Sequence, residues 1–310
     1  MIYYFYKVDM PIKNHLAWRG KPLAHIIQPM TYDRLFNSTS VKAGMYIFSD
    51  LERLTPAETE LAAKAWSTIR NSGQEVLLLN DPIRGMRRYE LLRTLYEQGI
   101  NPFNVYKLTE VRMPERYPVF IRFENDHKGS RSPLLHDKDE LLAAIYELEA
   151  QGMNRESMMI IEYINTADET GTYRKYSHFY VDGEVIARHL FQGEKWMLKV
   201  PGKLDETALA EERNFVESNP YREEIGRIFR IARIDYGRID FTVSNNRILV
   251  WEINTNPHIT HRKDAGGILR EPVQTFFVNA FHKRLLQLNI DSNVKIRLQS
   301  WMMSLAQTLS

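Results

Sequence analysis

The chemistry suggested by this sequence rests on two carboxylates and one amide. They are Asp240, Glu252 and Asn254, which lie close together near the carboxyl-terminal third of the chain. Carboxylate and amide oxygens are hard ligands, of the kind that Mg²⁺ or Mn²⁺ takes when it keeps some water and binds substrate phosphates. The three residues predict such a metal site if the fold brings them together. The alternative, from their chemistry alone, is an ordinary edge hairpin with acidic residues in water.

A hairpin is the element expected to position these side chains. Residues 235–243 alternate apolar and polar side chains, which favours a strand, and residues 247–253 predict a returning strand. The Ser-Asn-Asn cluster at 244–246 predicts the turn between them, because asparagine tolerates the left-handed conformation of tight turns. The hairpin carries Asp240 on its first strand and Glu252, with Asn254 just beyond, on its second.

The residues at the end of the second strand form a motif that resembles one of a known family. Residues 252–257 read Glu-Ile-Asn-Thr-Asn-Pro, which resembles the metal-binding signature Glu-x-Asn-x-x-Pro of the ATP-grasp superfamily. That superfamily includes D-alanine–D-alanine ligase, glutathione synthetase and the enzymes that add glutamate to a ribosomal protein. The resemblance implies an α/β (α+β) fold in which an N-terminal α/β lobe precedes two α+β lobes that clamp ATP. It also implies that Asp240, Glu252 and Asn254 hold Mg²⁺.

The resemblance assigns cations to the phosphates of ATP. Tyr117–Arg122 is a predicted strand, and Arg122 stands where the family has a lysine that binds phosphate. Arginine offers a planar fork of donors instead of a point charge, so its geometry toward phosphate differs. Lys199 matches a further phosphate-binding lysine, with Lys195 as its alternative. Arg88, on a predicted helix, matches another phosphate-contacting position; a solvated cation is the other interpretation.

A polar loop at residues 124–132 lies where the family has a glycine-rich loop over the phosphates. This version contains a single glycine. Lys128 and Ser130 would contribute a charge and a hydroxyl to phosphate binding. The alternative is a surface loop without a ligand.

The predicted strand ending at Glu162 resembles the hinge between the two nucleotide-clamping lobes. In the family the backbone of Glu-(aromatic)-Ile at this place pairs with the edge of adenine, which assigns Glu162, Tyr163 and Ile164. A carboxylate seven residues later often holds the ribose hydroxyls. Glu169 has this spacing, and Asp168 is its rival.

Four arginines are candidates for contacts with the reacting groups. Arg238 lies two residues before Asp240, so strand alternation places both side chains on one face. Several ligases of the family have an arginine there that stabilises the acyl phosphate, and the resemblance implies catalytic roles for Arg238 and Arg122. Arg174 and Arg188, on a predicted hairpin, either bind a substrate anion or face solvent as ordinary strand residues.

The remaining sequence predicts a multi-lobed protein. Thr55 to Glu58 has the capping residues of a helix start. No Gly-x-Gly-x-x-Gly or Walker-type loop follows the early strands, so a Rossmann or P-loop site is not expected. The predicted boundaries are residues 1–108 for an N-terminal α/β domain with a linker helix, 109–285 for the ATP-grasp domain, and 286–310 for a C-terminal helical tail. Within the second domain the small lobe covers about 109–162 and the large lobe about 163–285.

Composition narrows the class of protein. The chain has 310 residues, a net charge of +2 and no cysteine. Disulfides, thiolate metal sites and a cysteine nucleophile are therefore excluded. The balanced charge gives no argument for a nucleic-acid or membrane partner, and no apolar run reaches the length of a membrane helix. The start of the chain lacks the basic-then-apolar pattern of a signal peptide, so a cytoplasmic protein is expected.

The resemblance implies an ATP-dependent carboxylate–amine ligase that forms an amide or peptide bond through an acyl phosphate. Its partners would be a small acid, amino acid or peptide and an amine, and many such ligases are homodimers. Two alternatives stay open. One is a small-molecule kinase on the same scaffold, and the other is a nucleotide-binding protein with a degenerate site, which Arg122 and the glycine-poor loop favour.

Overall fold

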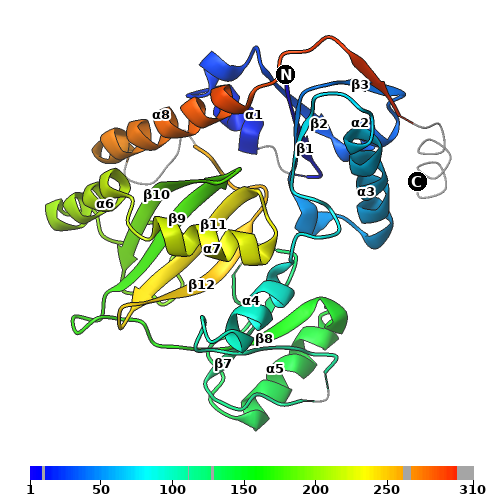
Figure 1. Cartoon of the computed structure of the whole chain (residues 1–310). Coiled ribbons are helices and arrows are strands. Elements are labelled where there is room, and N and C mark those ends of the chain that lie inside the picture. Colours follow the sequence, from blue (N-terminus) through cyan, green and yellow to red (C-terminus); the bar gives the residue numbers. More distant parts are fainter. Residues whose placement is uncertain (9–10, 111, 127–128, 261–266, 299–310) are drawn as a thin grey trace.

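The computed structural model describes residues 1–8, 11–110, 112–126, 129–260 and 267–298. In this part of the chain, a large lobe built on a four-stranded antiparallel sheet lies between two other lobes (Figure 1). An N-terminal α/β lobe lies at one end of that sheet and a small lobe at the other. The mixed α/β class predicted from the sequence is confirmed.

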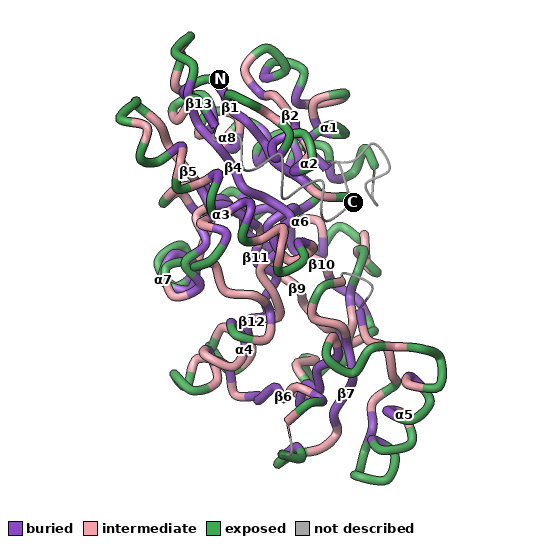
Figure 2. Tube along the Cα trace, turned by 90° about the vertical axis from the view of Figure 1, so that its right-hand side faces the viewer, coloured by how far each residue is buried: buried purple, intermediate pink, exposed green. Residues whose placement is uncertain are grey.

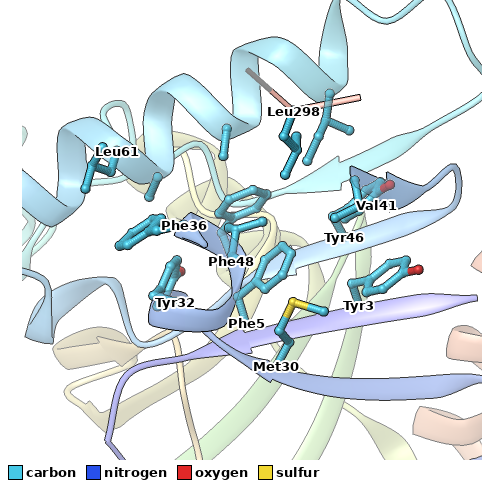
Figure 3. Packing of buried hydrophobic residues seen from close by; sticks show 14 of the residues in the cluster. Tyr3, Phe5, Met30, Tyr32, Phe36, Val41, Tyr46, Phe48, Leu61 and Leu298 are labelled. Carbon is cyan, nitrogen blue, oxygen red and sulfur yellow. The ribbon is translucent and has the colours of Figure 1, made fainter. Parts of the chain in front are cut away.

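A parallel sheet forms the centre of the N-terminal lobe. Its strand order is β2 (Ile27–Thr31), β1 (Ile2–Tyr6), β4 (Met45–Phe48) and β5 (Leu77–Leu79). Helices α2 (Tyr32–Phe36) and α3 (Pro56–Arg70) cover one face. Aromatic residues of the strands, such as Phe5 and Phe48, pack against these helices (Figure 3). The predicted start of α3 is confirmed, because Thr55 and Glu58 form a reciprocal capping box.

The second face of the same sheet packs against the large lobe. Tyr4 and Ile47 belong to one buried cluster with Phe179, Tyr236 and Phe281 of the large lobe. Strand β1 is consequently buried along its whole length, and Figure 2 shows β1 and β4 as buried segments in the upper part of that view. Sharing of a core on this scale holds the N-terminal lobe in a fixed position against the large lobe.

The large lobe has the antiparallel strand order β10-β9-β11-β12. The strands are β9 (Tyr173–Val181), β10 (Glu184–Gly193), β11 (Tyr236–Ser244) and β12 (Arg247–Asn254). Helices α6 (Glu206–Ser218) and α7 (Arg222–Ala232) lie across this sheet, and α8 (Glu271–Leu288) lies between it and the N-terminal lobe (Figure 1). The hairpin predicted for residues 235–253 is therefore confirmed as β11 and β12.

The small lobe is a three-stranded antiparallel sheet with one covering helix. The strand order is β6 (Val105–Lys107), β8 (Met158–Glu162) and β7 (Val119–Phe123), and α5 (Lys138–Ala150) covers it. Strand β6 precedes the predicted domain boundary at residue 109 and yet pairs with β8. Helix α4 (Arg88–Glu97) joins this lobe to β12, since Leu92 and Leu249 share a buried cluster.

The carboxyl-terminal segment differs from the sequence prediction. The helical tail predicted for residues 286–310 is wrong at Lys295–Arg297, which form strand β13 and pair with β3 (Ser40–Lys42) of the N-terminal lobe. Residues 299–310 lie outside the described part. The apolar residues Ile296 and Leu298 pack into the N-terminal core.

Several short elements were not predicted, namely α1 (Pro11–Leu16), β2, α2, β3, β6 and the 3-10 turns at Lys21–Leu23, Leu51–Arg53, Arg155–Ser157 and Gly267–Arg270. Elements of this length have no room for a recognisable hydrophobic period. Within the described ranges, none of the helices combines the length and the apolar character needed to span a bilayer.

Candidate active site

Asp240 and Glu252 occupy directly opposite positions on β11 and β12, and Arg238 lies opposite Asn254. The turn by itself sets a different register, in which Phe241 pairs with Val250. Continued without change, that register would place Glu252 on the face away from Asp240. Trp251 is an extra residue in β12, and this bulge shifts the pairing by one position. The bulge thereby brings both carboxylates to the same side of the sheet.

This side of the sheet forms a wall of a cavity of about 640 Å³. The cavity is lined by residues of the small lobe, the large lobe and the N-terminal lobe. The predicted site residues among them are Arg122, Glu162, Tyr163, Ile164, Lys199, Arg238, Asp240, Glu252 and Asn254. Segments from residues 122 to 254 thus meet in one place.

The Asp240 carboxylate is buried and surrounded by donors. Oδ1 accepts hydrogen bonds from Ser177 Oγ at 2.8 Å and from Arg238 Nε at 3.0 Å. The ammonium of Lys175 lies 3.5 Å from Oδ2. Arg238 and Asp240 share a face of β11, as the alternation of the strand predicts. The pair holds the Arg238 guanidinium in a defined orientation at the cavity wall.

Glu252 is held between two arginines from other parts of the chain. Its Oε2 accepts from Arg88 Nη2 at 2.5 Å and from Arg122 Nη2 at 3.0 Å. Burial, joined by repulsion from the Arg88 cation and opposed by Glu252, lowers the pKa of Arg122 to about 10. At neutral pH Arg122 remains charged and neutralises the carboxylate. A metal ion bound to the Glu252 carboxylate would therefore lie close to the guanidinium groups of Arg88 and Arg122.

Arg88 is buried, and its Nη1 donates to the carbonyls of Phe123, Glu124 and Asp126 at 2.8–2.9 Å. The position suggested for phosphate contact therefore links the end of β7 to Glu252. Arg88 does not belong to the cavity lining, and its contacts are those of a structural tether.

Asn254 is fixed by the residues that follow it. Its Oδ1 accepts from the backbone N–H of Asn256 at 2.8 Å, and Asn256 Oδ1 accepts from the hydroxyl of Tyr4 at 3.0 Å. Thr255 accepts from the backbone N–H of Leu51 at 3.1 Å. The N-terminal lobe thus positions the end of the hairpin.

The donor set at this place suits a hard divalent cation. Two carboxylates in register and an amide oxygen line the same cavity, and all three are oxygen donors. In the described ranges no group of three or more His, Cys, Asp or Glu side chains is arranged to hold a metal. The residues present therefore fit Mg²⁺ with an incomplete protein shell.

Aromatic side chains line another part of the cavity. The ring of Trp196 lies 5.0 Å from Phe120 and 5.6 Å from Tyr163, centroid to centroid, and Trp251 stacks on Phe103 at 5.2 Å. Phe120, Tyr163, Trp196 and Trp251 all face the cavity. Flat apolar surfaces of this kind suit a nucleobase.

The hinge residues have partners of their own. The buried Glu162 carboxylate accepts from Asn104 N and Tyr106 Oη at 2.9 Å, and it is paired with Arg116 at 2.6 Å. The backbone N–H of Glu162 donates to Asn104 O, and that of Tyr163 donates to Pro118 O. These two backbone N–H groups are therefore already hydrogen-bonded. The edge of an adenine would have to bind other backbone groups of the hinge, such as those of Ile164.

The polar loop after β7 closes against the segment that carries Lys199. A Cβ added to Gly129 would lie 2.6 Å from Met197 Sδ and 3.1 Å from Lys199 Nζ. Ser130 donates from N to Met197 Sδ at 3.3 Å and from Oγ to Ser132 O at 2.6 Å. Its hydroxyl is thus engaged within the loop and does not line the cavity. Lys128 lies outside the described residues.

The two candidates for ribose contact lie away from the cavity lining. Glu169 is exposed. The carboxylate of Asp168 accepts from the backbone N–H groups of Thr170 and Thr172 and pairs with Arg174. Asp168 therefore organises the loop that precedes β9, and neither carboxylate reaches the cavity wall in this arrangement.

The cavity also contains residues that were not predicted from the sequence, among them Lys175, His189 and Arg270. Lys175 lies two residues before Ser177, so strand alternation places both side chains on the same face of β9. His189 and Arg270 had no local signal. Arg270 comes from the 3-10 turn before α8, outside the β-strands that carry the predicted metal ligands of the large lobe.

Comparison with known proteins gives no match to a family model and none to a curated protein sequence. Solved structures do match. D-alanine–D-alanine ligase from Bacillus anthracis is 13% identical with a TM-score of 0.52, and the match covers 100% of this chain and 99% of that one. The ATP-grasp ligase PsnB, solved with a minimal precursor, is 10% identical with a TM-score of 0.51, over 90% and 98% of the two chains. At these identities the similarity shows the fold, and the ATP-grasp architecture predicted from the sequence is confirmed.

Proposed function

We propose that this chain, which has the ATP-grasp fold, is an ATP-dependent ligase that joins a carboxylate to an amine. The observation that carries the proposal is the pairing of Asp240 with Glu252, and of Arg238 with Asn254, on the wall of one cavity. The cavity volume of about 640 Å³ is within the range of small-molecule sites. Its aromatic part suits a base, and its charged part suits phosphates and a carboxylate.

The proposed reaction has two steps. An oxygen of the acid's carboxylate attacks the γ-phosphorus of ATP, the bond from that phosphorus to the bridging oxygen breaks, and ADP leaves with the electron pair. The amine nitrogen then attacks the acyl carbon, inorganic phosphate leaves, and the nitrogen loses a proton to solvent. Such transfers depend on positioning and on neutralisation of charge more than on covalent help from the protein.

Residues of this chain supply that positioning. Arg122 and Lys199 would hold the phosphates, and both line the cavity. Arg238 would meet the negative charge that develops on the acyl phosphate and its adduct, because Asp240 already fixes its guanidinium at 3.0 Å. Asp240, Glu252 and Asn254 would hold Mg²⁺, which when bound neutralises charge on the phosphates. Trp196 and Tyr163 would border the base.

The test begins with calorimetric titration of a non-hydrolysable ATP analogue, with and without Mg²⁺. We expect Mg²⁺ to strengthen binding to the wild type and to have much less effect on Glu252→Gln or Asn254→Ala. Glu252→Gln is preferable to alanine because its amide oxygen still accepts from Arg88 and Arg122. Glu223→Gln, an exposed residue of α7, is the matched control.

Release of ADP against a panel of acids and amines then identifies the reaction. A ligase requires both an acid and an amine, whereas a small-molecule kinase releases ADP without an amine. If the analogue does not bind under either condition, both activities are excluded and the degenerate site remains.

A further inference from the structure

One part of the cavity carries more positive charge than the assigned ATP contacts use. Among the described residues, eight arginines and lysines line the cavity against three carboxylates. Arg122, Lys199 and Arg238 have been assigned to phosphates and the acyl phosphate. Lys175, Arg188 and Arg270 have not.

A second bulge directs these cations into the cavity. In the β9–β10 pair, Ala187 lies opposite His178 and His189 lies opposite Ser177, so Arg188 is an extra residue in β10. Consecutive strand residues normally point to opposite faces, yet Arg188 and His189 both line the cavity. With regular alternation only one of Arg188 and His189 would face the cavity. The bulge lets both side chains face it, and Arg188 adds a cation to the wall.

Arg188 and Arg270 are buried and held from behind the cavity wall. Arg270 donates from Nε and Nη2 to the two oxygens of Glu212 at 2.8 Å and 2.6 Å. Arg188 donates to Ile259 O at 3.1 Å and to Gln274 Oε1 at 3.4 Å. Glu212, Ile259 and Gln274 do not line the cavity. Both guanidinium groups are thus oriented before any ligand arrives, which lowers the entropic cost of binding an anion.

Contacts around Phe191 place Lys175 and Arg270 in one cluster beside Asp240. The Phe191 ring has Arg270 at 5.0 Å and Lys175 at 5.3 Å from its centroid, and Lys175 also lies 3.5 Å from Asp240. His189 stacks on the same ring. Burial, together with the cations Arg188, Arg238, Lys175 and Arg270, lowers the pKa of His189 well below its ordinary value. His189 is consequently neutral and adds no charge.

We propose that the acid substrate carries a second carboxylate and that Arg188 and Arg270 bind it. The inference rests on the proposed function, because the reacting carboxylate must lie beside Arg238 and Asp240 at the γ-phosphate. Guanidinium groups form strong charge-assisted hydrogen bonds with carboxylates, and a partly enclosed site strengthens this interaction. The substrate class is therefore a dicarboxylic acid, an acidic amino acid or a peptide that ends in one.

The test compares matched acids that differ in one charge. Glutarate, glutamate and aspartate are set against pentanoate, glutamine and asparagine, with ADP release measured in the presence of an amine mixture. We expect the dicarboxylates to be preferred by about ten- to a hundredfold in kcat/KM, the range for one charged hydrogen-bonded contact. Arg188→Gln should reduce this preference by raising KM for the dicarboxylates more than KM for the monocarboxylates.

Arg270→Lys is the second variant, because it keeps a charge beside the buried Glu212 while losing the fork; we expect it also to reduce the preference. Arg222→Gln, an exposed partner of Glu184, is the control and should not change it. The inference would be overturned if the enzyme used both acid classes equally or preferred phosphorylated acids. It would also be overturned if Arg188→Gln reduced kcat/KM equally for both acid classes.

A binding experiment separates this inference from the proposed function. With the ATP analogue and Mg²⁺ bound, calorimetry should show tighter binding of glutarate than of pentanoate in the wild type, and a smaller difference in Arg188→Gln. If the analogue binds and the two acids do not differ, the second-carboxylate site is wrong while the ligase proposal survives. If the acids differ but no amine yields a product, the reaction is wrong and the anion site stands.

Discussion

Asp240 lies directly opposite Glu252 because Trp251 is an extra residue in β12. A similar bulge at Arg188 acts on β10, so both edge strands of this sheet change register at the level of the site. Bulges alter which side chains share a face without lengthening the loops. The polar wall of the cavity is thus a product of two local irregularities in an otherwise regular antiparallel sheet.

Arg88→Met is expected to destabilise the protein by about 3 kcal/mol, because Arg88 satisfies three carbonyls and pairs with a largely buried carboxylate. Urea unfolding measures the change. Arg213→Met on α6 removes an exposed pair with Glu217 and should cost less than about 1 kcal/mol. Equal losses in the two variants would contradict the role of Arg88 as a tether.

Tyr4→Phe removes the hydroxyl that donates to Asn256 across the lobe boundary. The loss of one buried hydrogen bond should reduce the free energy of unfolding by about 1 kcal/mol. It should also weaken the effect of Mg²⁺ on binding of the ATP analogue, because Asn256 holds Asn254. Tyr146→Phe, at an exposed position of α5, is the control for both measurements. An unchanged Mg²⁺ effect would show that the N-terminal lobe does not position Asn254.

Gly129→Ala is expected to weaken binding of the ATP analogue. Gly129 has a φ of 93°, and the added methyl group would displace Met197 and Lys199. Gly152→Ala also meets a positive φ, 79°, but has open space around the new Cβ. Both variants should lose about 1 kcal/mol of stability from backbone strain. Calorimetry should show weaker nucleotide binding for Gly129→Ala alone, and similar affinities in the two variants would contradict this reading.

Trp196→Leu should reduce affinity for the ATP analogue by about three- to tenfold, because stacking of an aromatic side chain on a base contributes roughly 1 kcal/mol. The same change should have little effect on binding of inorganic triphosphate, which has no base. Trp66→Leu, on α3 and outside the cavity, provides the control. If triphosphate and the analogue lose affinity equally, Trp196 does not contact the base.

Acidification should destabilise the protein through buried neutral histidines. Burial lowers the pKa of His178 to about 3, while its Nε2 lies 3.0 Å from Asn219 Oδ1. The unfolded chain takes up a proton near pH 6.5 and the folded chain does not, so stability present above that pH is lost as the pH falls. Between pH 7.5 and pH 5 the loss from this residue is about 2 kcal/mol.

His178→Gln should remove that part of the pH dependence, since the glutamine amide still donates to Asn219 and does not titrate. Urea unfolding at both pH values, for the wild type and the variant, measures the difference. The same loss of free energy in the two proteins would show that His178 is not neutral in the folded state, or is accessible to protons.

The sequence by itself determined the local features. Alternation predicted β11 and β12, asparagines predicted their turn, and Thr55 with Glu58 predicted the start of α3. It also determined the identities of the oxygen donors and their order along the chain. These features depend on hydrophobic period, turn geometry and capping, which are properties of a few neighbouring residues.

Only the tertiary structure decided which side chains meet. The bulge at Trp251 determines the face of Glu252, and a shift of one residue reverses every face in a strand. Arg88 and Arg122 reach Glu252 from 164 and 130 residues away, and Arg270 arrives from the turn before α8. Such contacts follow from how the lobes pack around a shared core, since no short stretch of sequence contains both partners. The chemical groups are therefore encoded locally, and their arrangement into a site is a result of packing.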